Sequence, residues 1–469
     1  MEAEGQNMLT VEKIGGTSMS SFGQVLHNII LNVPDKKYYK RVFVVSAYAG
    51  VTDLLLEHKK TGTPGIYAMF KNSEDYTGAL VELLTHLIKI NESFASLKLD
   101  LDKANAYITG RIQQTKSYLD SMADVITSGY VDKRSILLAA RELLASLGEA
   151  HSAFNAANIV NNHGIHATFV DLGGFHDSRN LTIDERIRMT LKEIDFSETI
   201  PIVTGYTKGT EGIMREFDRG YSEVTFSKIA VELKADEAII DKEFHLSSAD
   251  PKIVGEDDAI TVGFTNYDVA DQLADIGMEA IHPRASKMIE HAGINIRVKN
   301  TFEPDHPGTL ISKNYSGKES KVEIIAGTDK VVIIEIHDPS MVGHVGFDQG
   351  IMQHFYEYGI SYILKSTNAN SISLVIWEKD LRDRLIEELN NTYEQVTVKP
   401  VAVVCAIGSN IAKPGVLAKA AQVLAQNSIN INSLAQSLRQ VNIQFVIDRD
   451  RFKDAIIALN KALCVENGS

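Results

Sequence analysis

Cysteine is nearly absent: the 469 residues include two, Cys405 and Cys464, which lie far apart. Neither has another Cys or a His at the spacing of a zinc motif, so we expect reduced thiols and no metal site. No apolar run approaches the roughly 18 residues that a membrane helix requires. The opening residues MEAEGQNMLT also lack the basic and apolar regions of a signal peptide. These absences predict a cytoplasmic protein without disulfides and without a membrane partner.

An excess of positive charge is absent as well. The chain has 47 Lys and Arg against 61 Asp and Glu, which gives a net charge of −14 at pH 7. Such a surface repels nucleic acid and anionic membranes, so neither is an expected partner. A site for anionic ligands must then be a local positive exception. With 44% hydrophobic residues, the chain is long enough for two or three domains with their own cores.

One such exception lies near the start of the chain, in the stretch VEKIGGTSMS at residues 11–20. A short strand-like run ends in two glycines, which tolerate the dihedral angles of a sharp turn into a helix. Free amides at a helix start attract anions, and Lys13 adds a full positive charge, so the stretch suggests a phosphate cradle. The spacing is neither that of the P-loop nor that of the dinucleotide fingerprint. Taken alone, a tight turn with an exposed lysine is an equally good interpretation.

Strand-like runs alternate with helical stretches along the next 250 residues. Between about 57 and 162 the pattern is helical, which predicts a helical lobe. Alternation of strands and helices predicts a mainly parallel α/β sheet, with ligands at the carboxyl ends of the strands. Lys13 and Ser46 lie at such ends. We also expect a closing edge strand at residues 309–311. The expected strands of the sheet are 42–45, 165–172, 199–206, 237–241 and 294–300.

Three later stretches carry candidate site residues, each with an ordinary alternative. Glu149 stands beside Gly148 in an apolar helical stretch, so it is either a partly buried carboxylate that needs a cation or a surface glutamate. Arg219 precedes a helix start and suits a carboxylate ligand, or else a structural ion pair. The loop from Asp241 to Lys252 offers hydroxyls, carboxylates and a lysine, which suit a nucleotide with Mg²⁺ or simply form a polar loop.

The last 140 or so residues contain an internal repeat. VVIIEIHDPSMVG at Val331 returns as VAVVCAIGSNIAKPG at Val401, and later segments return at a nearly constant offset. Each copy is expected to form a small βαββα unit, and two copies predict a pair of packed domains. Neither copy contains a cluster of acids, bases or nucleophiles. We therefore interpret the pair as a ligand-sensing or dimerising module, with a purely structural role as the alternative.

Taken in order, these features resemble the aspartate kinases, which combine the amino-acid kinase fold with two ACT-type regulatory domains. The resemblance runs from about Val11 to Leu463. It implies an α/β fold, a three-layer αβα sandwich with a helical lobe, followed by two α+β ACT domains of βαββαβ topology. The implied domains are a catalytic domain over 8–320 and ACT domains over 328–397 and 398–469. The motifs that carry the resemblance are Lys13-Ile14-Gly15-Gly16-Thr17-Ser18, Val44-Val45-Ser46-Ala47, Gly148-Glu149 and Ile281-His282-Pro283-Arg284-Ala285.

The resemblance implies ATP-dependent phosphorylation of the side-chain carboxylate of L-aspartate to 4-phospho-L-aspartate, with Mg²⁺. This reaction opens the aspartate pathway to lysine, threonine, methionine or ectoine. The implied assembly is a homodimer or larger homo-oligomer, with an amino-acid effector at the ACT domains. The implied catalytic residues are Lys13, Arg219 and Glu223. The implied substrate-binding residues are Ser46, Glu149, Arg219 and Ser222. The implied nucleotide-binding residues are Lys13, Gly15, Gly16, Thr17, Ser18, Asp241, Asp250 and Lys252.

The sequence departs from the family pattern at several of these places. Tyr221 and Glu223 replace a glycine and an aspartate of the family motif Arg-Gly-Gly-Ser-Asp. Glu279 stands where a lysine is usual, and Lys252 where arginine is common. Together these departures resemble a divergent branch of aspartate kinases linked to ectoine synthesis. The segment 436–440 of the second repeat departs too, which implies weak or absent feedback by lysine or threonine.

Two other functions stay open from the sequence. The substitutions at Tyr221, Glu223 and Glu279 are compatible with a catalytically weakened amino-acid sensor that works through its ACT pair. Retention of Lys13, Glu149 and Arg219 argues against that alternative. A kinase for glutamate or a related acid differs only in the depth of its pocket, which residue spacing does not determine.

Overall fold

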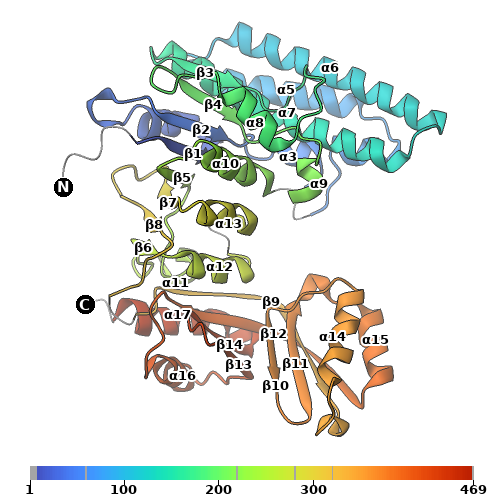
Figure 1. Ribbon diagram of the computed structural model, residues 1–469, viewed down its shortest axis with the longest axis vertical. Helices are drawn as coiled ribbons and strands as arrows, with labels where there is room; N and C mark the ends of the chain where they lie inside the picture. The colour runs from blue at the N-terminus through green and yellow to red at the C-terminus, as the bar shows by residue number, and fades with distance from the viewer. Residues whose placement is uncertain (1–7, 59–60, 218–219, 279–280, 319–320, 467–469) are drawn as a thin grey trace. The chain divides into compact units, whose positions relative to one another are not determined.

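The computed structural model describes residues 8–58, 61–217, 220–278, 281–318 and 321–466 (Figure 1). The chain divides into two compact units. The first comprises Met1–His245 and Arg284–Gly308, and the second comprises Leu246–Pro283 and Thr309–Ser469. Residues 246–283 thus fold with the C-terminal unit, whereas the sequence assigned them to a catalytic domain over 8–320. No helix in the described part of the chain is long and apolar enough to cross a membrane.

The first unit is built on a parallel sheet with strand order β3-β4-β2-β1-β5-β7. The central strand β1 is buried from Val11 to Ile14, as expected for a parallel sheet covered on both faces. Every strand expected in this sheet is present, and the predicted α/β class is confirmed. The strands are β1 (Thr10–Ile14), β2 (Arg41–Val45), β3 (Ala167–Val170), β4 (Ile200–Thr204), β5 (Glu237–Lys242) and β7 (Asn295–Asn300).

Helices cover both faces of this sheet. Helix α10 packs against β1, β2 and β5, and α7 packs against β2, β3 and β4. On the opposite face from α10, the backbone of the π-helical segment η1 accepts a hydrogen bond from Arg41 of β2. The segments around the sheet are α1 (Gly16–Ser20), α2 (Phe22–Gln24), η1 (Val25–Ile30), η2 (Pro34–Lys36), α3 (Val51–Leu55), α8 (Ile183–Leu191), α9 (Ile213–Phe217), α10 (Tyr221–Glu232) and α13 (Pro283–His291).

The predicted helical lobe is present at the top of Figure 1. Its two longest helices begin at aspartate caps: Asp100 accepts the N–H of Lys103, and Asp132 accepts that of Ser135. Gly129 ends the first of them in a left-handed conformation that glycine adopts without strain. Helix α7 then carries Gly148 and Glu149 back toward the sheet. The lobe comprises α4 (Ile66–Asn72), α5 (Thr77–Ser93), η3 (Ala95–Leu97), α6 (Leu101–Ser128) and α7 (Lys133–Asn162).

The second unit begins with short elements. Strand β8 (Thr309–Ile311), which was expected to be an edge strand, pairs in parallel with β6 (Phe264–Thr265). A two-residue strand such as β6 leaves no alternating pattern in the sequence. The helices that accompany these strands are α11 (Pro251–Val254) and α12 (Tyr267–Asp275).

Both sequence repeats lie in one antiparallel sheet with strand order β10-β11-β9-β12-β14-β13. Residues 395–401 of β12 pair with 331–337 of β9 inside the first repeat, whereas 403–407 pair with 324–328. The segment 324–328 therefore supplies the second repeat with a strand from before the first repeat. The elements are β9 (Ile324–His337), η5 (Pro339–Met341), α14 (Phe347–Glu357), β10 (Leu364–Thr367), β11 (Ser371–Trp377), η6 (Glu378–Asp380), α15 (Asp383–Thr392), β12 (Gln395–Ile407), α16 (Val416–Gln426), β13 (Ser433–Gln436), β14 (Asn442–Asp448), η7 (Arg449–Arg451), α17 (Phe452–Asn460) and η8 (Lys461–Val465).

Candidate active site

The glycine turn predicted after the first strand is present. Strand β1 ends at Ile14, and α1 begins at Gly16. A Cβ atom on Gly16 would lie 2.8 Å from the carbonyl oxygen of Ala47, so only glycine fits this close to the loop after β2. The N–H of Gly15 donates to the carbonyl of Asp241, at 3.4 Å. The turn is therefore held between the ends of β2 and β5.

The side chains of Thr17 and Ser18 differ in their surroundings. Thr17 is exposed, whereas Ser18 is fully buried. The hydroxyl of Ser18 lies 3.0 Å from that of Thr301, so it joins α1 to the segment after β7. Ser18 thus has a structural contact in addition to its predicted role beside a nucleotide.

Lys13 is held in place by an acidic residue from α10. Only 8% of its surface is exposed, and its Nζ lies 3.4 Å from Oε1 of Glu223. Glu223 stands in the first turn of α10. An ammonium group has three donors, so the contact with Glu223 leaves donors for a second anion. The structure therefore brings together the two predicted catalytic residues that lie within its described part.

Glu149 of α7 is 2% exposed. Its Oε1 accepts a hydrogen bond from Ser222 Oγ at 3.3 Å, while Oε2 has no hydrogen-bond partner among the described residues. Burial raises the pKa of Glu149 to about 7, and hydrogen bonds from Tyr221 and Ser222 act in the opposite direction. A buried carboxylate with one free oxygen is suited to a cationic ligand, because a cation would offset the cost of its burial.

Two glycines allow the segments around Glu149 to approach closely. A Cβ atom on Gly148 would lie 2.6 Å from that of Ala47, so this glycine lets α7 contact the loop after β2. A Cβ atom on Gly205, after β4, would lie 2.9 Å from the side chain of Ser222. In the loop after β2, the N–H of Ser46 donates to the carbonyl of Ile14 at 3.1 Å. The carbonyl of Ser46 accepts a hydrogen bond from the hydroxyl of Ser152 at 2.8 Å. Ser46 and Ser222 are thereby fixed beside Glu149.

The substitution at Tyr221 has a different consequence from the expected one. From the sequence, we expected the large side chain of Tyr221 to lie where the family's glycine lets the backbone approach a ligand. The side chain is instead 2% exposed and packs edge-on against Tyr206, with ring centroids 5.9 Å apart. It also hydrogen-bonds to Glu149. The tyrosine therefore fills protein interior behind the buried carboxylate.

Among the predicted nucleotide-binding residues, Asp241 does not join this cluster. Asp241 pairs in register with Ile14, so its side chain lies on the sheet face opposite that of Lys13. Asp250 and Lys252 belong to the second unit, where the carboxylate of Asp250 caps α11 by accepting the N–H of Lys252 at 2.9 Å. Arg219 and Glu279 lie outside the described residues.

Sequence reasoning missed a cavity of about 720 Å³ that begins one turn before Glu149 on α7. Ser146, Tyr206 and Glu142 line it, and Tyr206 donates to Glu142 at 2.7 Å. Gly173 and Gly174 also line the cavity, and they directly follow the strand expected at 165–172. A strand followed by two glycines also occurs at Gly15-Gly16. This repeated pattern was the signal in the sequence that could have indicated the cavity.

Comparison with known proteins agrees with this arrangement. Residues 8–300 match the model of the Amino acid kinase family, and residues 404–463 match that of an ACT domain. The first match covers more than half of the chain. Fold and glycine turn thus define an amino acid kinase, and the predicted fold is confirmed.

Similarity to individual proteins is more specific. Aspartate kinase Ask_Ect of Stutzerimonas stutzeri (strain A1501) is 44% identical over 463 residues, which are 97% of this chain and 97% of the relative. Aspartokinase 1, chloroplastic, of Arabidopsis thaliana is 26% identical over 98% of this chain and 81% of its own. The chain belongs to the aspartate kinases, as its motifs predicted.

Solved structures share the fold. The crystal structure of E. coli aspartokinase III in complex with aspartate and ADP superposes with a TM-score of 0.71 at 19% identity, over 97% of this chain and 99% of that one. The aspartate kinase of Clostridium acetobutylicum superposes with a TM-score of 0.68 at 21% identity, over 97% of this chain and 100% of that one. At these identities the likeness supports the architecture alone.

Proposed function

We propose that this protein transfers the γ-phosphoryl group of ATP to the side-chain carboxylate of L-aspartate and forms 4-phospho-L-aspartate. The observation that carries the proposal is the presence of two features around the carboxyl ends of the adjacent strands β1 and β2. One is the glycine turn with Lys13, and the other is the buried carboxylate of Glu149 with its free oxygen. The first suits a phosphate, and the second suits an ammonium group.

The chemistry requires little from a base. The side chain of free aspartate has a pKa near 3.9, so its nucleophilic oxygen is already ionised at neutral pH. What opposes the reaction is the repulsion between a carboxylate and a polyphosphate. Catalysis then depends on positioning and on neutralising charge, as in other phosphoryl transfers. In this proposal Lys13 and the amides of Gly15 and Gly16 meet the migrating group, beside Thr17 and Ser18.

The acceptor is held by other residues. Glu149 takes the ammonium of aspartate, with Ser222 and Ser46 beside it, and Arg219 takes a carboxylate. Glu223 fixes the ammonium of Lys13, with which it forms an ion pair at 3.4 Å. Asp250 and Lys252 contribute to nucleotide binding. For Asp241 we retain only the backbone contact to Gly15, because its side chain lies on the other face of the sheet.

Mg²⁺ belongs to the proposal as the ion that neutralises nucleotide phosphates. No group of three or more His, Cys, Asp or Glu in the described part of the chain could hold a metal ion. In this proposal the ion arrives with ATP, because Mg²⁺ retains its waters and binds mainly through substrate phosphates.

Hydroxylamine trapping tests the function, because it captures an acyl phosphate as a hydroxamate. The full chain is incubated with ATP, Mg²⁺ and one acceptor: L-aspartate, L-glutamate or N-acetylglutamate. We expect hydroxamate from aspartate, and none when ATP is omitted or when Lys13 is changed to Ala. No product from any acceptor, together with calorimetric binding of an amino acid, would establish the sensor instead. Equal yield from glutamate would reassign the acceptor.

The proposal extends to the pathway, the regulation and the compartment. The name of the relative with 44% identity, Aspartate kinase Ask_Ect, supports placement in the ectoine-linked branch. The ACT match over 404–463 supports an amino-acid effector and a homodimer or larger assembly through the C-terminal repeats. The cytoplasm is the proposed compartment.

A further inference from the structure

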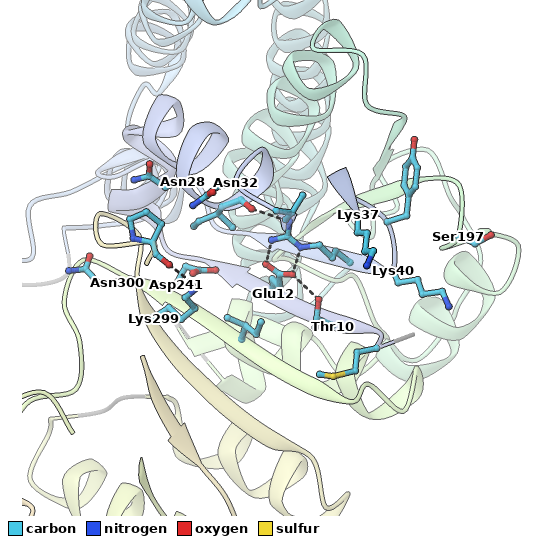
Figure 2. Close-up of a pocket in the computed structure, with 17 residues that line it drawn as sticks. Thr10, Glu12, Asn28, Asn32, Lys37, Lys40, Ser197, Asp241, Lys299 and Asn300 are labelled. Carbon is cyan, nitrogen blue, oxygen red and sulfur yellow. Dashed lines mark hydrogen bonds and ion pairs between the residues drawn. The ribbon is translucent and has the colours of Figure 1, made fainter. Parts of the chain in front are cut away.

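A second cavity lies on the face of the central sheet opposite Lys13. It has a volume of about 470 Å³, and its floor includes Glu12 of β1, Arg41 of β2 and Asp241 of β5 (Figure 2). These side chains share one face because the three strands are parallel and in register. Neither Lys13 nor Glu149 lines this cavity. It is therefore separate from the proposed site of phosphoryl transfer.

Two of the charged groups in this opposite-face cavity already satisfy each other. Arg41 binds both carboxylate oxygens of Glu12, with Nε–Oε1 and Nη2–Oε2 distances of 2.6 Å each. Thr10 donates to the same carboxylate at 2.7 Å, and Arg41 also donates to the carbonyl of Ile29 at 3.0 Å. Figure 2 draws contacts of this network as dashed lines around Glu12 and Thr10. It leaves Glu12 and Arg41 as a fixed, neutral pair.

Asp241 is different, because it has no such partner. Its side chain lines the cavity, the residue is 2% exposed, and Oδ2 has no hydrogen bond within the described residues. Burial raises the pKa of Asp241 to about 8, and the charge of Glu12 adds to the rise. Lys299 and Arg41 act in the opposite direction. A buried carboxyl oxygen without a partner is costly for the fold, and here it borders a space that a ligand could fill.

A cationic group stands beside this carboxyl. Lys299 of β7 is the register partner of Asp241, and adjacent strands lie about 4.8 Å apart. Its Nζ reaches only the carbonyl of Pro304, at 3.5 Å, among the contacts described. Lys37 and Lys40 also line the cavity, and the carbonyl of Lys40 accepts the N–H of Thr10, the first residue of β1. The charge of Lys299 acts on Asp241 more strongly than that of Arg41, which is already paired with Glu12.

We propose that the opposite-face cavity binds a free α-amino acid, with its ammonium against Asp241 and its carboxylate against Lys299. An α-amino acid carries both charges on one carbon, which matches a carboxyl and a lysine on neighbouring strands. A metal ion fits poorly, because one free carboxyl oxygen next to a lysine provides too few ligands. A simple anion leaves the buried carboxyl without a partner. The volume lies within the range of small-molecule pockets.

Such a site is placed to influence the proposed chemistry. The carbonyl of Asp241 accepts the N–H of Gly15, so the residue that holds the amino acid also supports the glycine turn. A ligand that fixes Asp241 therefore bears on the position of Gly15 from the opposite side of the sheet. This makes the cavity suited to an effector, whether or not aspartate proves to be the acceptor.

Calorimetry on the full chain tests the binding. The probes are glycine, L-alanine, L-glutamate and L-lysine, with ethylamine and propionate as molecules that carry only one of the two charges. We expect at least one amino acid to bind and neither single-charge probe to match it. At about pH 7 Asp241 is mostly protonated, so binding of an ammonium should release close to one proton, measured in two buffers of different ionisation enthalpy.

Two variants locate the signal. Asp241→Asn and Lys299→Gln should each weaken binding at least about tenfold, and the first should also abolish proton release. Lys192→Gln, an exposed lysine after α8, is the matched control and should bind normally. If Asp241→Asn does not fold, the calorimetric titration of Lys299→Gln still tests whether the amino acid binds in this cavity. Absence of binding, equal binding by ethylamine, or unchanged binding in the variants would each overturn the proposal.

Discussion

The ammonium of Lys13 lies 3.4 Å from the carboxylate of Glu223, although 210 positions separate the two residues in the chain. The contact joins the end of β1 to the first turn of α10 and fixes the positive side chain that stands beside the glycine turn. The acid in this contact is a glutamate, at the position where the family motif has an aspartate.

Removal of Lys13 should therefore damage turnover far more than substrate affinity. Lys13→Ala is expected to lower kcat by about 10²–10³, the usual effect of losing one preorganised group that stabilises a transition state. The KM for aspartate should change little, because Glu149 and Arg219 are proposed to hold that substrate. Steady-state hydroxamate assays measure both constants. A variant with normal kcat would remove the lysine from the mechanism.

The acid at position 223 gives a finer test of the same pair. Glu223→Gln removes the charge that fixes Lys13, whereas Glu223→Asp keeps the charge on a shorter side chain. We expect kcat to fall more in Glu223→Gln than in Glu223→Asp, because the ion pair holds the ammonium in its buried position. The opposite order, measured in the same assay, would mean that length rather than charge matters here.

Much of this site was predictable from local sequence. Lys13, Gly15 and Gly16 lie within four consecutive residues of the chain, and a buried strand followed by glycines has a strong local signal. Glu149 was also predictable, because a carboxylate in an apolar helical stretch is unusual. The cost of burying it follows from elementary solvation.

Long-range pairing was not predictable in the same way. Asp241 was expected beside the nucleotide, but its register with Ile14 places its carboxyl on the other face. One position along a strand decides the face, and the boundaries of strands are the least certain part of a sequence pattern. The same reason hid the pairing of 324–328 with the second repeat. Neither segment contains a signal for its distant partner.

Gly148 should be intolerant of any side chain. Gly148→Ala would place a Cβ 2.6 Å from that of Ala47, and neither backbone has room to move without shifting Glu149. We expect a loss of about 1–3 kcal/mol in the free energy of unfolding, the usual cost of overpacking, together with weaker aspartate binding. Gly110→Ala in α6 is the control: nothing lies within 4 Å, so stability should rise by up to about 1 kcal/mol. Equal behaviour of both variants in thermal unfolding would contradict this account.

Glu149 should make aspartate binding pH-dependent. Its pKa is raised to about 7 by burial, and only the ionised form attracts an ammonium. With that pKa, the ionised fraction grows about tenfold between pH 6 and pH 8, so kcat/KM for aspartate should rise by about the same factor. Glu149→Gln should lower kcat/KM and remove the rise. Glu92→Gln, an exposed position on α5, should preserve it. A wild-type profile that is flat across this window would exclude Glu149 as the group that meets the ammonium.

Asp241 should make the ligand-free fold less stable as pH rises. Its pKa is about 8 in the folded chain against an ordinary value of 3.8, so the folded state binds more protons than the unfolded state between these values. The free energy of unfolding must then fall as pH increases from about 4 to about 8. Asp241→Asn, which cannot ionise, should remove this part of the slope and stabilise the protein by a few kcal/mol at about pH 8. Denaturant unfolding at about pH 5 and pH 8 measures the difference. A buried acid that is neutral in the fold must release its proton when the chain unfolds above its ordinary pKa. If the variant and the wild type lose stability equally between these two pH values, the carboxyl of Asp241 is not neutral in the folded protein.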